Sequence, residues 1–352
     1  MKEESMMKKT LALILAACMT VALAACGSPG PDGGSAAPPS GGGGTEFPAM
    51  HLQLGHVNPT TDEDQYHKYA VLFAEKVTER TGGAVTFDIL GNSELGGEQE
   101  MLTGFDVGTH EVAIISNLAL ANVYGPCNVV EMPFMFSSNE KAWSFLDSDI
   151  MQGVKDSLYD EMGYKVLAYG EGGFRNVLSQ KAIRTPADIA AMKIRVPESR
   201  SFIATFETLG ANPTPMAFAE VFTAVQQHVI DGLELPVASA YTGSYYEICS
   251  HYDLTGHFYN ALGMVCSKSF WEGLSPELQE IFLTSAQEAA EEQRQWLQQA
   301  SEDMLQKMED GGCTVVRDVD TEAFRAAAAP VYDEYRDIIG GSLLDDALGF
   351  LS

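Results

Sequence analysis

The chain carries few positive charges for its size. Lysine and arginine together number 21 among 352 residues, against 49 aspartates and glutamates, which gives a formal net charge of −28. Nucleic acids and anionic membrane surfaces repel an acidic protein, so neither is expected as a partner. Any anionic ligand would therefore need a local cluster of positive charge that is shielded inside the protein.

The sequence also lacks the motifs of the common catalytic and cofactor-binding sites. It contains no P-loop, GxSxG turn, HExxH helix, EF-hand loop or complete dinucleotide fingerprint. Its seven histidines are scattered, and no cysteine pair has metal-binding spacing, so we expect no metal, no cofactor and no enzymatic activity. Buried free thiols and disulfides both remain open for Cys127, Cys249, Cys266 and Cys313.

The N-terminal segment is predicted to direct export. Lys8 and Lys9 precede an apolar run from Leu11 to Ala25, which is short for a membrane span and ends in small residues. The tetrapeptide LAAC that ends at Cys26 resembles a bacterial lipobox, in which the cysteine is lipidated and becomes the new N-terminus. A similar tetrapeptide ends at Cys18, and an ordinary signal peptide is a further alternative.

Residues 1–25 are therefore interpreted as a lipoprotein signal peptide, and residues 26–46 as a flexible tether. The tether is rich in glycine, proline and serine, a composition that cannot bury a core. This layout is typical of an exported protein on the outer face of the cytoplasmic membrane or in the periplasm, with Cys26 as its membrane contact.

Two stretches each predict the order strand, helix, strand, helix, strand. In the first, the strands lie at 51–57, 84–90 and 111–116; the second runs from 193 to 236. Right-handed crossovers make the strands of each unit parallel, so their carboxyl ends meet at one edge. Open α/β sheets bind ligands at that edge, and two such units can face each other across a cleft.

The remaining chain is predicted to join and brace these two units. An uninterrupted helical stretch at 276–308 would span about 50 Å, enough to contact both halves, although two ordinary helices are the alternative. We expect an α/β protein with one lobe at 47–172 and 261–300, a second lobe at 173–260 and 301–352, and no need to oligomerise. The other predicted elements are a crossing strand at 164–169, a helix at 237–249, and strands at 253–259 and 263–267.

Two arginines are predicted at strand ends that border the cleft, Arg175 and Arg195. Arginine keeps its charge, and its planar fork grips a carboxylate through two parallel hydrogen bonds. Either arginine could instead lock a buried carboxylate, for example Glu171 or Glu234. The residues expected to border a ligand beside the two arginines are Asn58, Ser116, Asn117, Glu171, Phe174, Phe218, Glu234 and Leu235.

Four motifs carry a family resemblance that extends from His51 to about Asp310. They are KIRVP at 193–197, EMPFMF at 131–136, GGFRN at 172–176 and LGANPTPMAFAEVFTAVQQHVIDGLELP at 209–236. The chain resembles the solute-binding proteins of TRAP (tripartite ATP-independent periplasmic) transporters, of the C4-dicarboxylate and sialic-acid binder type.

The resemblance implies a two-lobed periplasmic-binding-protein fold of type II, with crossing hinge strands and a long helix that spans both lobes. The lobes would close on a small organic acid and deliver it to TRAP membrane subunits for uptake driven by an ion gradient. Arg195 matches the family's carboxylate-binding arginine, Arg175 a second arginine, and Phe218 a pocket phenylalanine. Leu235 replaces an asparagine of sialic-acid binders, and Ser116 stands where some members have an acid, so a different acid is expected.

Two other functions remain open at this point. A ligand-sensing lipoprotein would present its closed form to a receptor instead of a transporter. A secreted enzyme acting on sugar acids would use Glu171 and Glu234 as a pair of catalytic carboxylates, although the sequence lacks any recognised catalytic motif.

Overall fold

A single mixed β-sheet organises residues 47–352, the part of the chain that the computed structural model describes. The strands are β1 (Met50–Gly55), β2 (Val85–Leu90), β3 (Val112–Ser116), β4 (Tyr164–Ser179), β5 (Lys193–Val196), β6 (Asn212–Pro215), β7 (Gly232–Pro236), β8 (His251–Ser267) and β9 (Thr314–Val316). They follow the order β2-β1-β3-β8-β4-β7-β5-β6, and β9 pairs with the first residues of β8. The predicted signal peptide, Cys26 and the tether lie outside the described residues.

Both predicted βαβαβ units are present, and their strands are parallel. β1 pairs with β2 and β3, and β5 pairs with β6 and β7. The crossover helices are α2 (Gln65–Arg80) and α3 (Glu98–Val107) in the first unit, and α8 (Arg200–Thr208) and α9 (Phe218–Gln226) in the second. These two predictions are confirmed. They succeed because the apolar periodicity of each helical segment matches the face that the helix buries.

We call the first unit, with the helices that follow it, the first lobe, and the second unit, with one helix before it and two after it, the second lobe. The first lobe adds α4 (Asn117–Val123), the 3₁₀ helix η1 (Gly125–Val129), α5 (Asn139–Leu146) and α6 (Asp149–Met162). The second lobe adds α7 (Pro186–Ile189), α10 (Val237–Thr242) and α11 (Tyr245–Ile248). A single helix was expected over 237–249, but Ser244 adopts a left-handed conformation (φ 54°) that ends α10 and separates it from α11.

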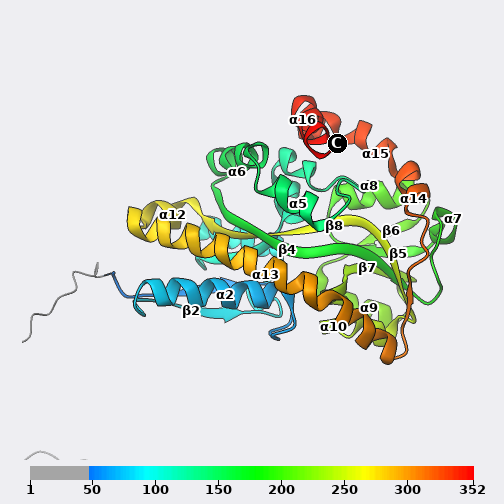
Figure 1. The fold of residues 1–352 in the computed structure, drawn as a ribbon, viewed down its shortest axis with the longest axis horizontal. Helices are drawn as coiled ribbons and strands as arrows, with labels where there is room; N and C mark the ends of the chain where they lie inside the picture. Colours follow the sequence, from blue (N-terminus) through cyan, green and yellow to red (C-terminus); the bar gives the residue numbers. More distant parts are fainter. Residues whose placement is uncertain (1–46) are drawn as a thin grey trace, which may run out of the picture. The chain divides into compact units, whose positions relative to one another are not determined.

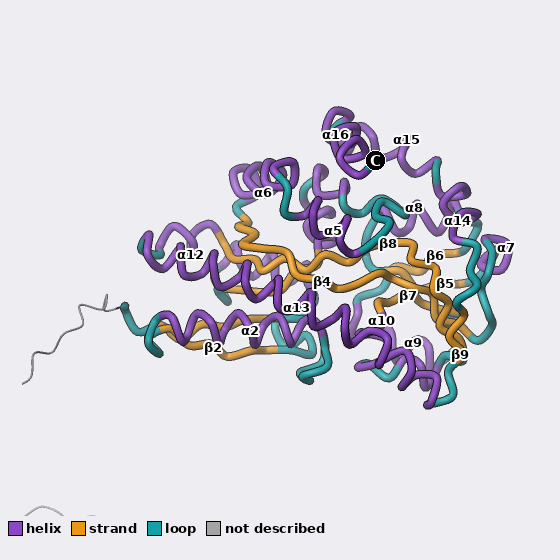
Figure 2. Tube along the Cα trace, viewed as in Figure 1, coloured by secondary structure: helices purple, strands orange, loops and turns teal. Residues whose placement is uncertain are grey.

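The long antiparallel strands β4 and β8 cross from one lobe to the other. They pair from Tyr164 opposite Ser267 to Ser179 opposite His251, while β3 adds to one end of this ladder and β7 to the other. Figure 2 shows both strands running through the middle of the fold. The separate strands expected at 253–259 and 263–267 are therefore one strand, and the strand expected at 164–169 continues to Ser179.

Two glycines explain why β4 passes through the crossing point without a turn. A Cβ atom on Gly172 would lie 2.2 Å from Nδ2 of Asn260 on β8, so only glycine allows this close approach. Gly173 has a φ of 91°, and the register between β4 and β8 shifts at this point. The residues form a β-bulge inside the strand.

Helix α13 (Pro276–Asp310) is unbroken over 35 residues, as predicted. The hydroxyl of Ser275 accepts a hydrogen bond from the backbone N–H of Leu278, and Pro276 occupies the first helical turn. The helix packs against α2, β4, α10 and β9 and so contacts both lobes (Figure 1). Helix α12 (Lys268–Gly273) precedes α13 in the chain.

The C-terminal helices, which were expected to belong to the second lobe, contact both lobes. These helices are α14 (Thr321–Ala328), α15 (Pro330–Ile339) and α16 (Gly341–Leu351). α14 packs on α7 and α8, α15 packs on α8 and η1, and α16 packs on η1, α5 and α6. The assignment of 301–352 to the second lobe remains a prediction.

The four cysteines of the described residues, Cys127, Cys249, Cys266 and Cys313, are buried free thiols. Burial raises the pKa of each thiol, to about 11 for Cys313 and about 12 for Cys249 and Cys266. These side chains therefore behave as small apolar groups in the core.

An aromatic cluster under α13 is expected to contribute strongly to stability. Phe282 is fully buried, and its ring centroid lies 5.7 Å from that of Phe73 and 5.8 Å from that of Phe270. Phe282→Ala should lower the free energy of unfolding by about 3–5 kcal/mol in urea titrations, because it leaves a cavity. Phe350→Ala, at a side chain 43% exposed, is the matched control. Equal effects of the two changes would contradict the assignment of Phe282 to the core.

Candidate functional site

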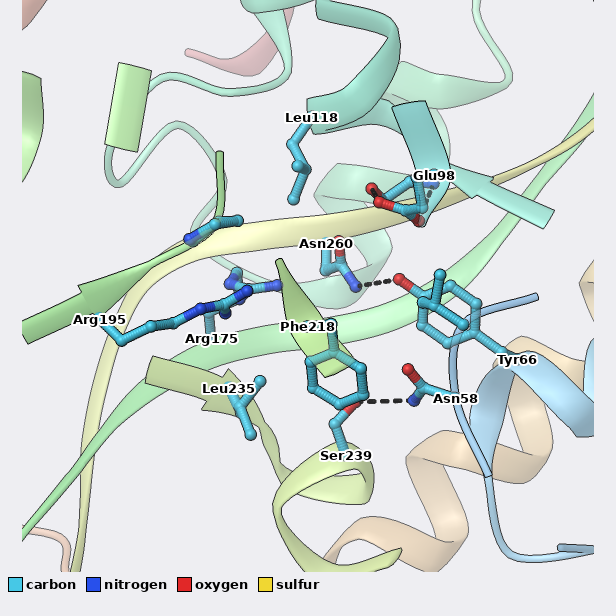
Figure 3. A pocket seen from close by; sticks show the side chains of 13 residues that line it. Asn58, Tyr66, Glu98, Leu118, Arg175, Arg195, Phe218, Leu235, Ser239 and Asn260 are labelled. Atoms are coloured by element: carbon cyan, nitrogen blue, oxygen red, sulfur yellow. Dashed lines mark hydrogen bonds between the residues drawn. The ribbon is translucent and has the colours of Figure 1, made fainter. Parts of the chain in front are cut away.

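A cavity lies where the carboxyl ends of the parallel strands of both lobes meet. Its empty volume, which includes the open mouth, is about 380 Å³. The cavity continues into a wider groove of about 1190 Å³, and Val57, Glu98, Leu118, Arg195, Pro197 and Phe218 border both. The cavity itself is lined by Val57, Asn58, Tyr66, Glu98, Ser116, Leu118, Arg175, Arg195, Pro197, Phe218, Leu235, Ser239 and Asn260 (Figure 3).

Arg195 supplies a buried positive charge at this cavity. It lies on β5, one residue before the strand ends, and only 3% of its surface is exposed. Its Nε and Nη2 atoms donate hydrogen bonds to the backbone oxygen of Met216, at 3.1 and 2.6 Å. Burial lowers the pKa of Arg195 to about 10, so the side chain remains charged at neutral pH. Among residues 47–352, no carboxylate lies within ion-pair distance of it.

Arg175 differs from Arg195, because a carboxylate already pairs with it. Its Nη2 donates to Oε1 of Glu234 at 2.8 Å and to the backbone oxygen of Glu234 at 3.1 Å, and its Nε also bonds to this carboxylate. His257 places Nε2 3.4 Å from the same carboxylate. Burial is the largest single influence and would raise the pKa of Glu234, but the charges and hydrogen bonds of Arg175 and His257 together outweigh it and hold the pKa below its usual value.

Glu98 brings a negative charge to the opposite side of the cavity. It is the first residue of α3, and its carboxylate accepts hydrogen bonds from the backbone N–H of Ser116 at 2.7 Å and from the Ser116 hydroxyl. In Figure 3, Glu98 lies near Tyr66, on the side of the cavity away from Arg195. Burial raises the pKa of Glu98, although the bonds from Ser116 and the charges of both arginines reduce this rise.

Six of the ten residues expected at the ligand line this cavity. They are Asn58, Ser116, Arg175, Arg195, Phe218 and Leu235. Phe218 begins α9 and is half-buried, whereas Leu235 is buried on β7. The structure thus brings these six side chains together; whether each of them contacts a ligand stays a prediction.

The other four expected residues lie outside the cavity lining. Glu234 is bound to Arg175, and Glu171 accepts a hydrogen bond from Nε1 of Trp143 at 2.9 Å. Phe174 neighbours Arg175 on β4, so the two side chains point to opposite faces, and its ring packs on Tyr259 at 5.3 Å. The amide of Asn117 bonds to Cys127 O, Glu131 and Tyr169.

Sequence reasoning missed four polar residues of the lining: Tyr66, Glu98, Ser239 and Asn260. Tyr66 and Glu98 lie in the first turns of α2 and α3, and the sequence does not show that these turns border a ligand. Asn260 stood inside the apolar run FYNALGMV, where a buried amide requires a partner. In the structure its Nδ2 lies 3.5 Å from the Tyr66 hydroxyl. That unusual asparagine was the signal that could have indicated a cleft residue.

No grouping of three or more histidine, cysteine, aspartate or glutamate side chains within residues 47–352 could hold a metal ion. The nearest approach to such chemistry at the cavity is Glu98, whose oxygens are engaged by Ser116. The lining consists of two cations, one acid, neutral hydrogen-bonding groups and apolar side chains. This combination suits a small anion that also carries hydroxyl groups.

Comparison with known proteins decides the family. Residues 54–337 match the model of the DctP family, described as bacterial extracellular solute-binding protein, family 7. The chain belongs to this family. The 2,3-diketo-L-gulonate-binding periplasmic protein YiaO of Escherichia coli K12 is 35% identical over 280 residues, which cover 79% of this chain and 84% of that protein.

Solved structures of TRAP periplasmic solute-binding proteins share the two-lobed fold. One from Polaromonas, bound to D-erythronate, superposes with a TM-score of 0.81 and 30% identity over 85% of this chain and 98% of that chain. Another from Sulfurospirillum deleyianum, bound to succinate, gives a TM-score of 0.79 and 28% identity over 86% and 99% of the two chains. The expected fold and the expected role as a TRAP solute-binding protein are therefore confirmed.

A buried carboxyl beside the site should make stability depend on pH. Glu131 is 2% exposed, and burial raises its pKa to about 8. Because the unfolded chain loses this proton near pH 4.5, the stability that the protonated group provides is lost as pH rises from about 4.5 through 8. Glu131→Gln should therefore reduce the difference between the urea midpoints at pH 5 and pH 8.

The control for this experiment is Glu291→Gln, at an exposed acid on α13. It should leave the difference between the two midpoints as it is in the original protein. If Glu131→Gln also leaves it unchanged, Glu131 is ionised in the folded protein at both pH values, and the assignment fails.

Proposed function

We propose that this protein captures a small organic acid in the cavity between the lobes and delivers it to TRAP membrane subunits for ion-gradient-driven uptake. The observation that carries the proposal is Arg195, a buried guanidinium that has no carboxylate partner among the described residues. A buried charge without a counter-ion is costly, and the carboxylate of a ligand would supply the missing charge. Family membership supports the transport role.

The cavity suits a polyhydroxylated monocarboxylate. Arg175 is already neutralised by Glu234, so Arg195 is the cation that remains for a ligand carboxylate. Glu98 faces the ligand from the other side, where it can accept hydrogen bonds from hydroxyl groups and repels a second carboxylate. Relatives that bind D-erythronate and 2,3-diketo-L-gulonate support this class of ligand.

The remaining lining residues divide into polar contacts and apolar walls. Asn58, Tyr66, Ser239 and Asn260 offer hydrogen-bonding groups, whereas Leu118, Phe218 and Leu235 offer apolar surface. A ligand enclosed by these groups would lose contact with water, and its charge-assisted hydrogen bonds would become stronger. Closure of the lobes about β4 and β8 would provide this enclosure.

The geometry disfavours the alternative of an enzyme acting on sugar acids. The two carboxylates considered for catalysis, Glu171 and Glu234, do not line the cavity, and Arg175 binds Glu234. An acid and a base must both reach the reacting atoms to act on a glycosidic or similar bond. We therefore propose that the protein binds its ligand without turnover.

Export and lipidation at Cys26 complete the proposal. The description of the family as extracellular and the periplasmic location of YiaO support export. Among residues 47–352, no helix combines the length and the apolar character needed to cross a bilayer. A lipid on Cys26 would hold the protein near the transporter. The alternative is that the protein presents its closed form to a receptor. Loss of ligand uptake by cells that lack the TRAP membrane subunits would exclude it.

Replacing Arg195 by lysine tests the carboxylate-binding role. An ammonium group cannot reproduce the two parallel hydrogen bonds of the guanidinium fork. Arg195→Lys should weaken binding of D-erythronate or L-galactonate, measured by calorimetry, by about 1.5–3 kcal/mol, or roughly 10- to 150-fold. Arg184→Lys, at an exposed arginine paired with Asp318, is the matched control. Equal affinities of the two variants would exclude Arg195 as the carboxylate-binding residue.

The proposed selectivity depends on Glu98. Glu98→Gln removes the charge that repels a second carboxylate, so binding of succinate relative to D-erythronate should improve by about tenfold, or about 1.4 kcal/mol. Glu94→Gln, at an exposed acid of the same lobe, should leave this ratio unchanged. An unchanged ratio in Glu98→Gln, with both acids still bound, would show that another feature sets the preference.

A further inference from the structure

A set of buried and part-buried side-chain hydrogen bonds joins the two lobes beside the cavity. Ser239 on α10 accepts a hydrogen bond from Nε2 of Gln65 at 2.6 Å and another from Nδ2 of Asn58 at 3.1 Å. Thr242, three residues further along α10, shares its single hydroxyl proton between Oδ2 of Asp64 at 3.0 Å and the backbone oxygen of Ala238 at 2.9 Å. The same oxygen of Asp64 accepts from Nδ2 of Asn58 at 2.9 Å. The three first-lobe residues of this set, Asn58, Asp64 and Gln65, all lie in the segment 58–65.

The first-lobe end of this set is fixed in place by α2. Asp64 is the N-cap of that helix, and its Oδ1 accepts hydrogen bonds from the backbone N–H groups of Tyr66 and His67, at 2.8 and 3.2 Å. One carboxylate oxygen of Asp64 therefore caps α2, and its second oxygen accepts a hydrogen bond from α10 of the second lobe. A movement of α10 away from the first lobe would leave the second oxygen without the Thr242 hydroxyl.

The set also continues to the strand that crosses between the lobes. Nε2 of Gln293, on α13, donates to the backbone oxygens of Gln65 at 3.2 Å and of Glu171 at 2.7 Å. Its Oε1 accepts from the backbone N–H of Glu171 at 2.8 Å. Glu171 directly precedes the bulge at Gly172 and Gly173, so Gln293 satisfies the backbone where the ladder is irregular. The cavity, α13 and β4 are thus linked by one series of contacts.

We propose that Ser239 and Thr242 on α10, together with Asn58, Asp64 and Gln65, form a latch that holds the lobes closed and sets how long a ligand stays bound. The inference rests on the proposed function at one point, because it takes the molecule enclosed in the cavity to be the ligand. Thr242 is a positioning residue, because it does not line the cavity and acts through Asp64. Ser239 both lines the cavity and belongs to the latch.

The latch has the physical properties that such a role requires. The two bonds to Ser239 are buried and the bond from Thr242 to Asp64 is part-buried and charge-assisted, so their loss on opening leaves polar groups to be solvated again. The bonds that Ser239 and Thr242 make to Asn58, Asp64 and Gln65 bridge different lobes, whereas a hydrogen bond within one lobe is kept during a hinge motion. The same bonds would stabilise the closed form of the protein whether or not a ligand occupies the cavity.

Thr242→Val tests the latch without touching the cavity lining. Valine keeps the volume of threonine and removes the hydroxyl. We expect the dissociation rate of D-erythronate, measured by stopped flow, to rise about tenfold. Thr103→Val is the matched control, because the exposed Thr103 also donates its hydroxyl to a backbone oxygen four residues earlier but has no bond to the other lobe. Thr242→Ser should restore slow dissociation, because it keeps the hydroxyl.

A second measurement is independent of any ligand. Spin labels at Glu94→Cys and Glu220→Cys, two exposed sites at the cleft, report the distance between the lobes when Cys18 and Cys26 are replaced by serine. Thr242→Val should shift the distance distribution of the unliganded protein toward longer distances, and Thr103→Val should not. Unchanged distances and dissociation rate in Thr242→Val would overturn the latch. Failure of every tested acid to bind the unaltered protein would instead contradict the proposed function, and the distance measurement would still decide on the latch.

Discussion

The buried charge of Arg195 is the constraint on which this account depends. A guanidinium that is 97% shielded from solvent, in a protein of net charge −28, is held by the backbone oxygen of Met216 and by no carboxylate among residues 47–352. Arg175 shows the contrasting solution, because the carboxylate of Glu234 forms an ion pair with it. The two arginines share one cavity, yet only one of them is left to attract an anion. An incoming carboxylate is therefore stabilised by a charge that the fold has already desolvated.

The rest of the fold positions that charge and the surfaces around it. The parallel units bring the strand ends of both lobes to one cavity, while β4 and β8 run through both lobes and α13 packs along β4. In the proposed site, Glu98 at the start of α3 would disfavour an anion with a second carboxylate. The contacts of α10 with Asp64 and Gln65 would tie the enclosure of the cavity to the position of the lobes. Binding and closure are therefore parts of one arrangement.

Much of this arrangement could be predicted from the sequence, and the failures have physical causes. The βαβαβ units and α13 have strong local periodicity, which sets each element before tertiary contacts form. β4 was expected to end at residue 169, before Gly172 and Gly173, although these glycines continue the strand and allow a close approach to Asn260. β8 was expected as two strands, one on each side of residues 260–262. Arg195 and Phe218 were found through their places at strand and helix ends. Glu98, Tyr66 and Ser239 were missed, because a helical residue shows which face it occupies only once its neighbours are known, and Phe174 and Asn117 face other partners.

The most direct test of the central claim is a crystal structure of the protein with a bound sugar acid such as D-erythronate. We expect the ligand carboxylate to pair with the guanidinium of Arg195, at about 2.7–2.9 Å, and hydroxyl groups of the ligand to face Glu98. A ligand that lies outside this cavity, or one whose carboxylate points toward Glu98 while Arg195 contacts no oxygen of it, would contradict the account.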